Sequence, residues 1–140
     1  MRNHKILILS FFTILCFAGY SLAEVRHWNQ IDTDDLTQVE IKGKYYDLLK
    51  HNKAELTKTV KQCLEVINQD DDIMRNELKK EWKMAFLTSQ NDWDKLIESD
   101  KKVIEYGHCG GSGTEIFILK YQIDKTIERI KELKERFCLN

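Results

Sequence analysis

Apolar residues recur at helical spacing over three long segments of the chain, and this pattern predicts three helices. Between residues 44 and 69 they fall three, four or seven positions apart, which places them on one face of a helix with 3.6 residues per turn. The predicted stripe consists of Tyr46, Leu49, Leu56, Val60, Cys63, Leu64 and Ile67. Lysines and glutamates occupy the opposite face, so this helix is expected to bury one side only.

The second and third helices are expected at residues 72–106 and 114–137. Ser89 and Asp100 interrupt the second stripe, and a buried Asp100 carboxylate would need a partner. The other positions of that stripe are Met74, Leu78, Trp82, Ala85, Phe86, Trp93, Leu96, Ile97, Val103 and Ile104. The third stripe has the near-heptad spacing of a bundle helix and consists of Ile116, Leu119, Ile123, Ile127, Ile130, Leu133 and Phe137.

Short polar segments separate the three stripes. Residues 70–72 are aspartates that suit the positive end of the second helix. Residues 107–113 hold four of the chain's six glycines and predict a tight reversal with positive φ angles. Ser112 or Thr114 would cap the third helix. Because short connections join antiparallel neighbours, the expected fold class is all-α, an antiparallel three-helix bundle.

Residues 24–43 show no sustained period and are expected to form a mostly irregular arm. Thr33 is a candidate cap for one short helix, whereas residues 39–46 alternate like a strand and Gly43 should interrupt a helix there. Trp28 is expected to dock on the bundle rather than to bind a ligand.

The first 23 residues have the layout of a secretory signal peptide. A basic start is followed by an almost wholly apolar run over residues 6–20 and by small residues that suit cleavage after Ala23. The run is shorter than the about 20 residues of a membrane-spanning helix. We therefore expect a secreted or periplasmic protein that consists of the arm, residues 24–43, and a helical bundle domain, residues 44–140.

The charge balance argues against a nucleic-acid partner. The chain has 22 basic and 23 acidic residues; without Arg2 and Lys5, 20 basic residues remain against 23 acidic ones, a formal net charge of −3. Affinity for phosphates comes from clustered lysine and arginine, which a mildly acidic chain does not suggest. We expect neither a nucleic acid nor a small-molecule substrate as the partner.

Three cysteines remain after residue 23. A straight helix over residues 114–137 is roughly 35 Å long, so Cys109 and Cys138 lie at its opposite ends and cannot bond within one chain. Cys63 lies in the last turns of the first helix, where the C-terminus should return, so we expect a Cys63–Cys138 disulfide. Cys109 would then be an unpaired thiol or would join two chains as a homodimer.

No segment of the sequence suggests a catalytic, cofactor-binding or metal site. His108 and Cys109 are adjacent, but a nucleophile and its base need a third, orienting group, and a metal needs three or four ligands. The glycines lack the Lys-Ser/Thr of a phosphate loop. We therefore expect a binding protein that is not an enzyme and needs no cofactor.

Gln90 and Arg129 are expected to meet across the helical hairpin. Gln90 lies 20 residues before Gly110 and Arg129 lies 19 residues after it. A hydrogen bond between the two side chains would fix the register of the second and third helices. Trp93, one helical turn after Gln90, is expected to be a core residue.

A set of these residues resembles a known family. Over residues 54–137 the chain is similar to the lysozyme inhibitor LprI-like family of small exported proteins, and the motif residues are Gln90, Trp93, Gly110, Gly111, Ser112, Thr126, Arg129 and Leu133. The resemblance implies a periplasmic or surface helical protein that inhibits lysozyme. The contact would be the loop at residues 107–113 with Glu105 and Glu115. The alternative is a structural or assembly protein of the cell envelope without lysozyme activity.

Overall fold

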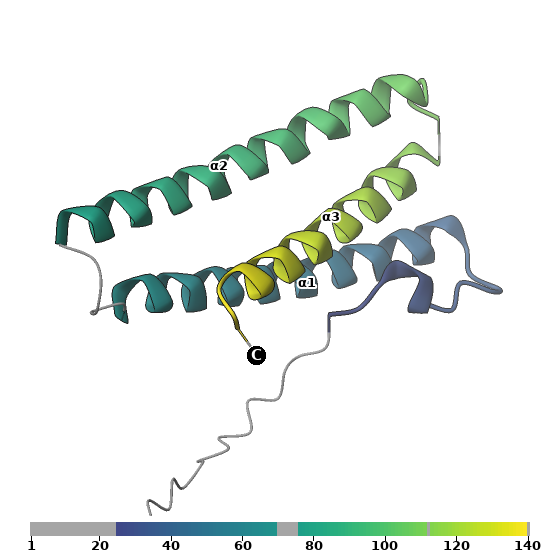
Figure 1. The fold of residues 1–140 in the computed structure, drawn as a ribbon. Helices are drawn as coiled ribbons and strands as arrows, with labels where there is room; N and C mark the ends of the chain where they lie inside the picture. The colour runs from purple at the N-terminus through teal and green to yellow at the C-terminus, as the bar shows by residue number, and fades with distance from the viewer. Residues whose placement is uncertain (1–24, 70–75, 112, 140) are drawn as a thin grey trace, which may run out of the picture.

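A computed structural model describes residues 25–69, 76–111 and 113–139. Its elements, in chain order, are the short 3-10 helix η1 (Trp28–Gln30) and the helices α1 (Gln38–Gln69), α2 (Asn76–Gly107) and α3 (Thr114–Arg136) (Figure 1). The described residues contain no strand, which confirms the all-α class. The predicted signal peptide and the aspartates at 70–72 lie outside the described residues.

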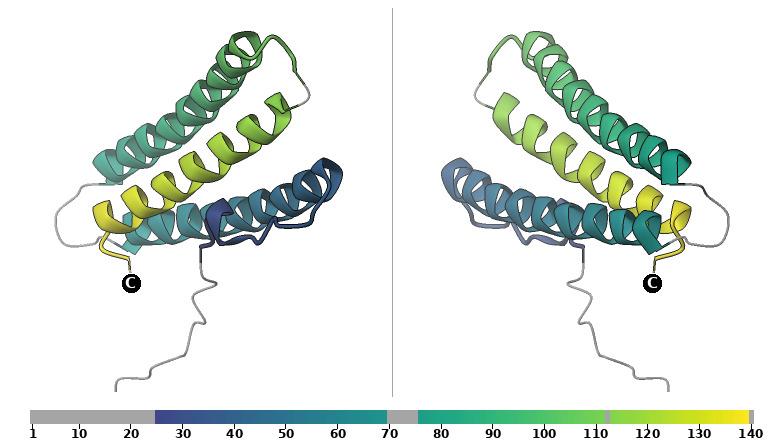
Figure 2. Two further views of the ribbon diagram at one scale, coloured as in Figure 1. Left: turned by 90° about the vertical axis from the view of Figure 1, so that its right-hand side faces the viewer. Right: turned by 90° about the vertical axis from the view of Figure 1, so that its left-hand side faces the viewer.

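Helix α3 lies between α1 and α2 in every view (Figures 1 and 2). Consecutive helices are antiparallel, so α1 and α3 run in the same direction. Among the three long helices, this parallel pair forms the most extensive contact, and α1 and α2 form the least extensive one. Within the described residues, no helix is long and apolar enough to cross a membrane.

Helix α1 begins earlier than the sequence pattern predicts. Thr37 and Glu40 form a capping box: the Thr37 backbone N–H donates to the Glu40 carboxylate at 2.9 Å, and the Glu40 N–H donates to the Thr37 hydroxyl at 3.3 Å. The strand-like alternation over residues 39–46 was therefore misleading, and Gly43 is helical. The expected cap at Thr33 is also wrong, because Thr33 begins a turn closed by the Leu36 N–H at 3.2 Å.

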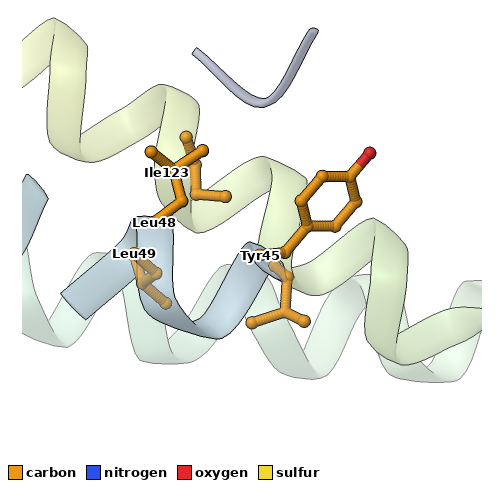
Figure 3. Close-up of a cluster of buried hydrophobic side chains, with 5 residues drawn as sticks. Tyr45, Leu48, Leu49 and Ile123 are labelled. Carbon is orange, nitrogen blue, oxygen red and sulfur yellow. The ribbon is translucent and has the colours of Figure 1, made fainter. Parts of the chain in front are cut away.

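One hydrophobic cluster joins the first turns of α1 to the first half of α3 (Figure 3). It contains Tyr45, Leu48, Leu49, Leu119 and Ile123. Trp28 packs against this cluster, as predicted, and the Lys120 ammonium lies 4.1 Å from the centroid of its ring. The arm is also held by the buried Asn52, which donates to the Arg26 carbonyl at 3.0 Å.

A second cluster closes the opposite end of the bundle. It contains Cys63, Ile67, Phe86, Leu133 and Phe137. The Phe137 ring meets Phe86 edge-on at a centroid distance of 5.3 Å and stacks on Trp82 at 6.0 Å. Aromatic pairs at such distances add to the free energy of burial, so Phe137 fixes the end of α3 against α2.

The helical stripes are buried only in part. Tyr46 is exposed and its neighbour Tyr45 is buried instead, because α1 turns a slightly different face to α3 than the pattern indicates. On α2, Phe86 and Ile97 are buried, whereas Leu96 and Val103 stay exposed. Met74 lies outside the described residues. The exposed positions arise because α2 packs against the rest of the bundle along one narrow face.

Candidate functional site

A polar cross-link joins α2 to α3 near the middle of the bundle. The Arg129 guanidinium is buried, and its Nε donates to Gln90 Oε1 at 3.3 Å. Its Nη2 donates to the Ser89 hydroxyl at 3.2 Å, and its Nη1 pairs with Glu132 at 2.6 Å. A buried charge is tolerated only with such partners, so these four side chains fix how α2 and α3 lie against each other. The Gln90–Arg129 contact confirms the sequence prediction.

The neighbouring candidate residues also hold the helices together. Trp93 is half-buried and lines a hollow of about 310 Å³ with Leu56 and Val60 of α1. Thr126 is buried, and its hydroxyl donates to the Gln122 carbonyl one turn earlier at 2.7 Å. Leu133 is fully buried in the second cluster. The burial of Thr126 and Leu133 and the packing of Trp93 beside α1 support a structural role for these side chains.

The reversal between α2 and α3 forms an exposed tip. Gly110 has φ +66°, and Cys109 has φ +51° although it is not a glycine. The His108 ring stacks on Phe117 with centroids 4.5 Å apart, and Tyr106 beside it is 80% exposed. The predicted positive φ angles are therefore present, and the tip carries three aromatic rings at the surface.

The start of α3 is anchored to α1 by Glu115. Its carboxylate pairs with the Lys42 ammonium at 2.6 Å and accepts a hydrogen bond from the Tyr46 hydroxyl at 2.5 Å. These two hydrogen bonds, the first above all, hold the pKa of the Glu115 carboxyl below its usual value. Gly113 precedes α3 without a side-chain cap, and Thr114 is its first helical residue, so the cap predicted at Thr114 is wrong.

A hollow of about 420 Å³ lies beside the tip, between the starts of α1 and α3. Its lining consists of Lys42, Glu105, Gly110, Gly111, Thr114, Glu115 and Ile118. Two carboxylates therefore face one recess, and only the Glu115 carboxylate is matched by a lysine there. Ser112, predicted as part of this region, lies outside the described residues.

A family model described as lysozyme inhibitor LprI matches residues 30–133. The chain belongs to the lysozyme inhibitor LprI family. The matched region includes the cross-link at Gln90 and Arg129 and the whole tip, and it begins upstream of the 54–137 range in which the sequence shows the resemblance. Searches of curated proteins and of solved structures found no match.

The motif residues predicted from the sequence resemblance lie in two groups in space. Gln90, Trp93 and Arg129 lie among the buried contacts, while Gly110 and Gly111 lie at the exposed tip. Because α3 rises about 1.5 Å per residue, the tip and Arg129 are separated by roughly 22 Å or more. The first group makes contacts between the helices, and the second is exposed to solvent.

The predicted Cys63–Cys138 disulfide is not formed in this structure, in which Cys63, Cys109 and Cys138 are all free. Cys63 is fully buried in the second cluster, whereas Cys138 follows Phe137 and is exposed with φ +51°. The physical reason is that Phe137 occupies the core position at the end of α3 and turns the next residue outward. Burial raises the pKa of the Cys63 thiol to about 11. The expected pairing of Cys109 between two chains stays a prediction.

Asp100 finds a partner that sequence reasoning missed. The Tyr121 hydroxyl of α3 donates a short hydrogen bond to its carboxylate. Burial and this hydrogen bond raise the pKa of Tyr121 to about 12. The sequence contained a signal for this pairing, because Asp100 lies 10 residues before Gly110 and Tyr121 lies 11 residues after it. Among the described residues, no cluster of three or more His, Cys, Asp or Glu side chains could hold a metal ion.

Proposed function

We propose that this LprI-family protein is an exported inhibitor of lysozyme that acts by binding and not by catalysis. The observation that carries the proposal is the family match over residues 30–133, which covers α1 and α2 entirely and α3 as far as Leu133. The candidate N-terminal signal peptide with cleavage after Ala23 supports export to the periplasm or the cell surface. Nucleic acids and small-molecule substrates are not the proposed partners.

The tip of the α2–α3 hairpin is the proposed contact with lysozyme. Tyr106 and Phe117 are exposed there, and the stack of His108 on Phe117 holds two of the rings in place. Aromatic side chains contribute a large share of the free energy at protein interfaces, and more so when they are already fixed before binding. These rings therefore supply the apolar part of the contact.

The acidic recess beside the tip supplies the polar part of the contact. Glu105 is exposed at the end of α2 and has no ion pair among the described residues, while Glu115 is already engaged by Lys42. A lysine or arginine side chain of the partner would find the Glu105 carboxylate free to pair. The proposed inhibitor thus offers aromatic rings and one unpaired carboxylate to a basic surface.

The proposal is tested by titrating lysozyme with the purified chain that begins at residue 24. We expect loss of lysozyme turnover, and Tyr106→Ala should weaken inhibition about tenfold, or roughly 1.4 kcal/mol. Met84→Ala is the matched control, because Met84 is exposed on α2 far from the tip. Unchanged turnover at a large molar excess of inhibitor would contradict the proposal and favour the alternative of a structural envelope protein.

Export is tested separately by the mass of the mature protein. Cleavage after Ala23 predicts a chain of residues 24–140 in the periplasmic or secreted fraction. An intact chain that stays in the cytoplasm would contradict the export proposal and leave the inhibition experiment unaffected.

A further inference from the structure

Helix α2 carries a second apolar stripe that the bundle leaves uncovered. It consists of Leu78, Ala85, Leu96 and Val103, and all four side chains are exposed, Leu78 by 48%, Leu96 by 55% and Val103 by 69%. Among residues 25–69, 76–111 and 113–139, no helix lies on the outer side of α2, because α3 and α1 both lie on its other side (Figure 2). An exposed apolar stripe of this length favours a partner that removes it from water.

The four residues lie on one line along the helix. With about 100° of turn per residue, spacings of seven, eleven and seven positions keep them within about 20° of each other. The buried Phe86 and Ile97 point roughly 80–100° away, toward the bundle. The stripe therefore faces away from Phe86 and Ile97, and only at Ala85 does it border a hollow that core residues also line.

We propose that a second copy of this chain docks on this stripe, with the two α2 helices antiparallel about a two-fold axis. In this register Leu78 faces Val103 of the second copy, and Ala85 faces Leu96 of the second copy. A two-fold axis repeats both pairs, so all four apolar residues of each chain are covered at once. The stripe is self-complementary because its two ends and its two inner positions match in pairs.

A hollow in the surface of the protein fits this register. Its volume is about 200 Å³ and its lining is Trp82, Ala85, Phe86, Ser89, Arg136 and Phe137. In antiparallel helix packing, a side chain enters a hole formed by four residues of the facing helix at relative positions −3, 0, +1 and +4. Around Ala85 these are Trp82, Ala85, Phe86 and Ser89. Leu96 of the second copy therefore points into a hollow that already exists.

Charges along the stripe favour the antiparallel direction. Glu81 and Lys102 lie on the same rim, both exposed, and neither has an ion pair among the described residues. The proposed register sets Glu81 beside Lys102 of the second copy, on both sides of the axis. A parallel dimer would set Glu81 beside Glu81 of the second copy and Lys102 beside Lys102 of the second copy, so like charges would meet. Such rim pairs contribute little free energy but select the orientation.

The centre of the stripe is polar and helps to fix the register. Ser89 and Asp92 lie between Ala85 and Leu96, and the proposed register sets Ser89 opposite Asp92 of the second copy. A shift by one helical turn would place Asp92 against an apolar residue and desolvate its carboxylate.

This dimer is distinct from one joined by Cys109. The two-fold axis passes between residues 90 and 91, so the two Cys109 residues lie about 55 Å apart. A disulfide between them cannot form inside the proposed dimer. The dimer should persist in reductant and in the Cys109→Ser variant.

The first test is the mass in solution of the purified chain from residue 24, measured by light scattering over a range of concentrations. We expect a reversible dimer that Cys109→Ser leaves unchanged. Leu96→Lys should weaken it at least about tenfold, because it sets a charge in the hollow. Met84→Lys, the matched control on another face of α2, should leave it unchanged. Circular dichroism confirms that both variants keep their helix content.

The second test is cross-linking in a Cys109→Ser/Cys138→Ser background. Leu78→Cys with Val103→Cys should give a covalent dimer on oxidation, whereas Leu78→Cys with Met84→Cys should not. A chain that is monomeric up to its solubility limit would overturn the proposal. So would a dimer that Cys109→Ser abolishes or that Leu96→Lys leaves intact. Each outcome is independent of lysozyme inhibition.

Discussion

Arg129 of α3 donates from Nε to Oε1 of Gln90 on α2 at 3.3 Å, and this contact links the two arms of the hairpin. Gln90 and Arg129 are two of the residues on which the sequence resemblance to the family rests; Arg129 is buried and Gln90 is half-buried. These two residues therefore serve mainly to pack α2 against α3. The exposed motif residues Gly110 and Gly111 are at the tip, about 22 Å or more away along α3.

Arg129→Ala should lower the free energy of unfolding by about 1–3 kcal/mol, because Ser89 and Gln90 then lose their buried partner. Arg136→Ala is the matched control. Arg136 is exposed and pairs with the same Glu132, so its loss should cost less than about 1 kcal/mol. Urea denaturation measures both values, and equal losses in the two variants would show that the cross-link does not stabilise the fold.

Tyr121→Phe should remove a pH-dependent part of the stability. The pKa of Tyr121 is raised from 10.0 to about 12, so its contribution is complete below about pH 10 and is lost as the pH rises toward 12. The sign follows because the phenol ionises first in the unfolded chain. The difference in urea midpoint between the native chain and Tyr121→Phe should shrink from about pH 9 to about pH 11. A constant difference would argue against the Tyr121–Asp100 hydrogen bond.

The sequence predicted the three helices well because each stripe follows a 3.6-residue period over many turns. The start of α1 was missed because residues 39–46 also fit a strand period, and the alternation outweighed the Thr37–Glu40 capping box. That box was visible as T-x-x-E and would have corrected the boundary. Local capping chemistry was the better indicator there.

Thr37→Ala should therefore cost about 1 kcal/mol of stability, because the first N–H groups of α1 lose their acceptor. Thr33→Ala is the matched control, since the Thr33 side chain does not cap a helix. The free energies of unfolding of the two variants decide the matter. If Thr33→Ala costs as much as Thr37→Ala, the start of α1 at Gln38 is not supported.

Equal distances from the turn predicted Gln90–Arg129 correctly, whereas the expected return of the C-terminus to the end of α1 did not give a Cys63–Cys138 disulfide. Gln90 and Arg129 lie on two helices joined directly by a short turn, so the number of residues from the turn fixes their positions along the two helix axes. The Cys63–Cys138 pairing depends on which way the chain leaves α3, and the core position taken by Phe137 decides that. Tertiary packing also decides which side of α2 stays uncovered, and the hydrophobic periodicity of the sequence does not predict that packing.

Thiol labelling of the chain from residue 24 should distinguish its three cysteines. Cys63 is fully buried and its pKa is raised to about 11, so it should react only after unfolding. Cys109 and Cys138 are exposed and should react at once in the native protein. Mass spectrometry counts the labels: two in the folded chain and three in denaturant. A chain that takes up one label in either state, without reductant, would restore the Cys63–Cys138 disulfide.

The most direct test of the proposed function is hydrogen exchange of this protein with and without lysozyme, followed by peptide mass spectrometry. We expect slower exchange on binding at the tip, over residues 103–117, and unchanged exchange around the buried Gln90–Arg129 contact. A complex that protects only other surfaces, or no protection at saturating lysozyme, would contradict the assignment of the tip as the lysozyme-binding surface.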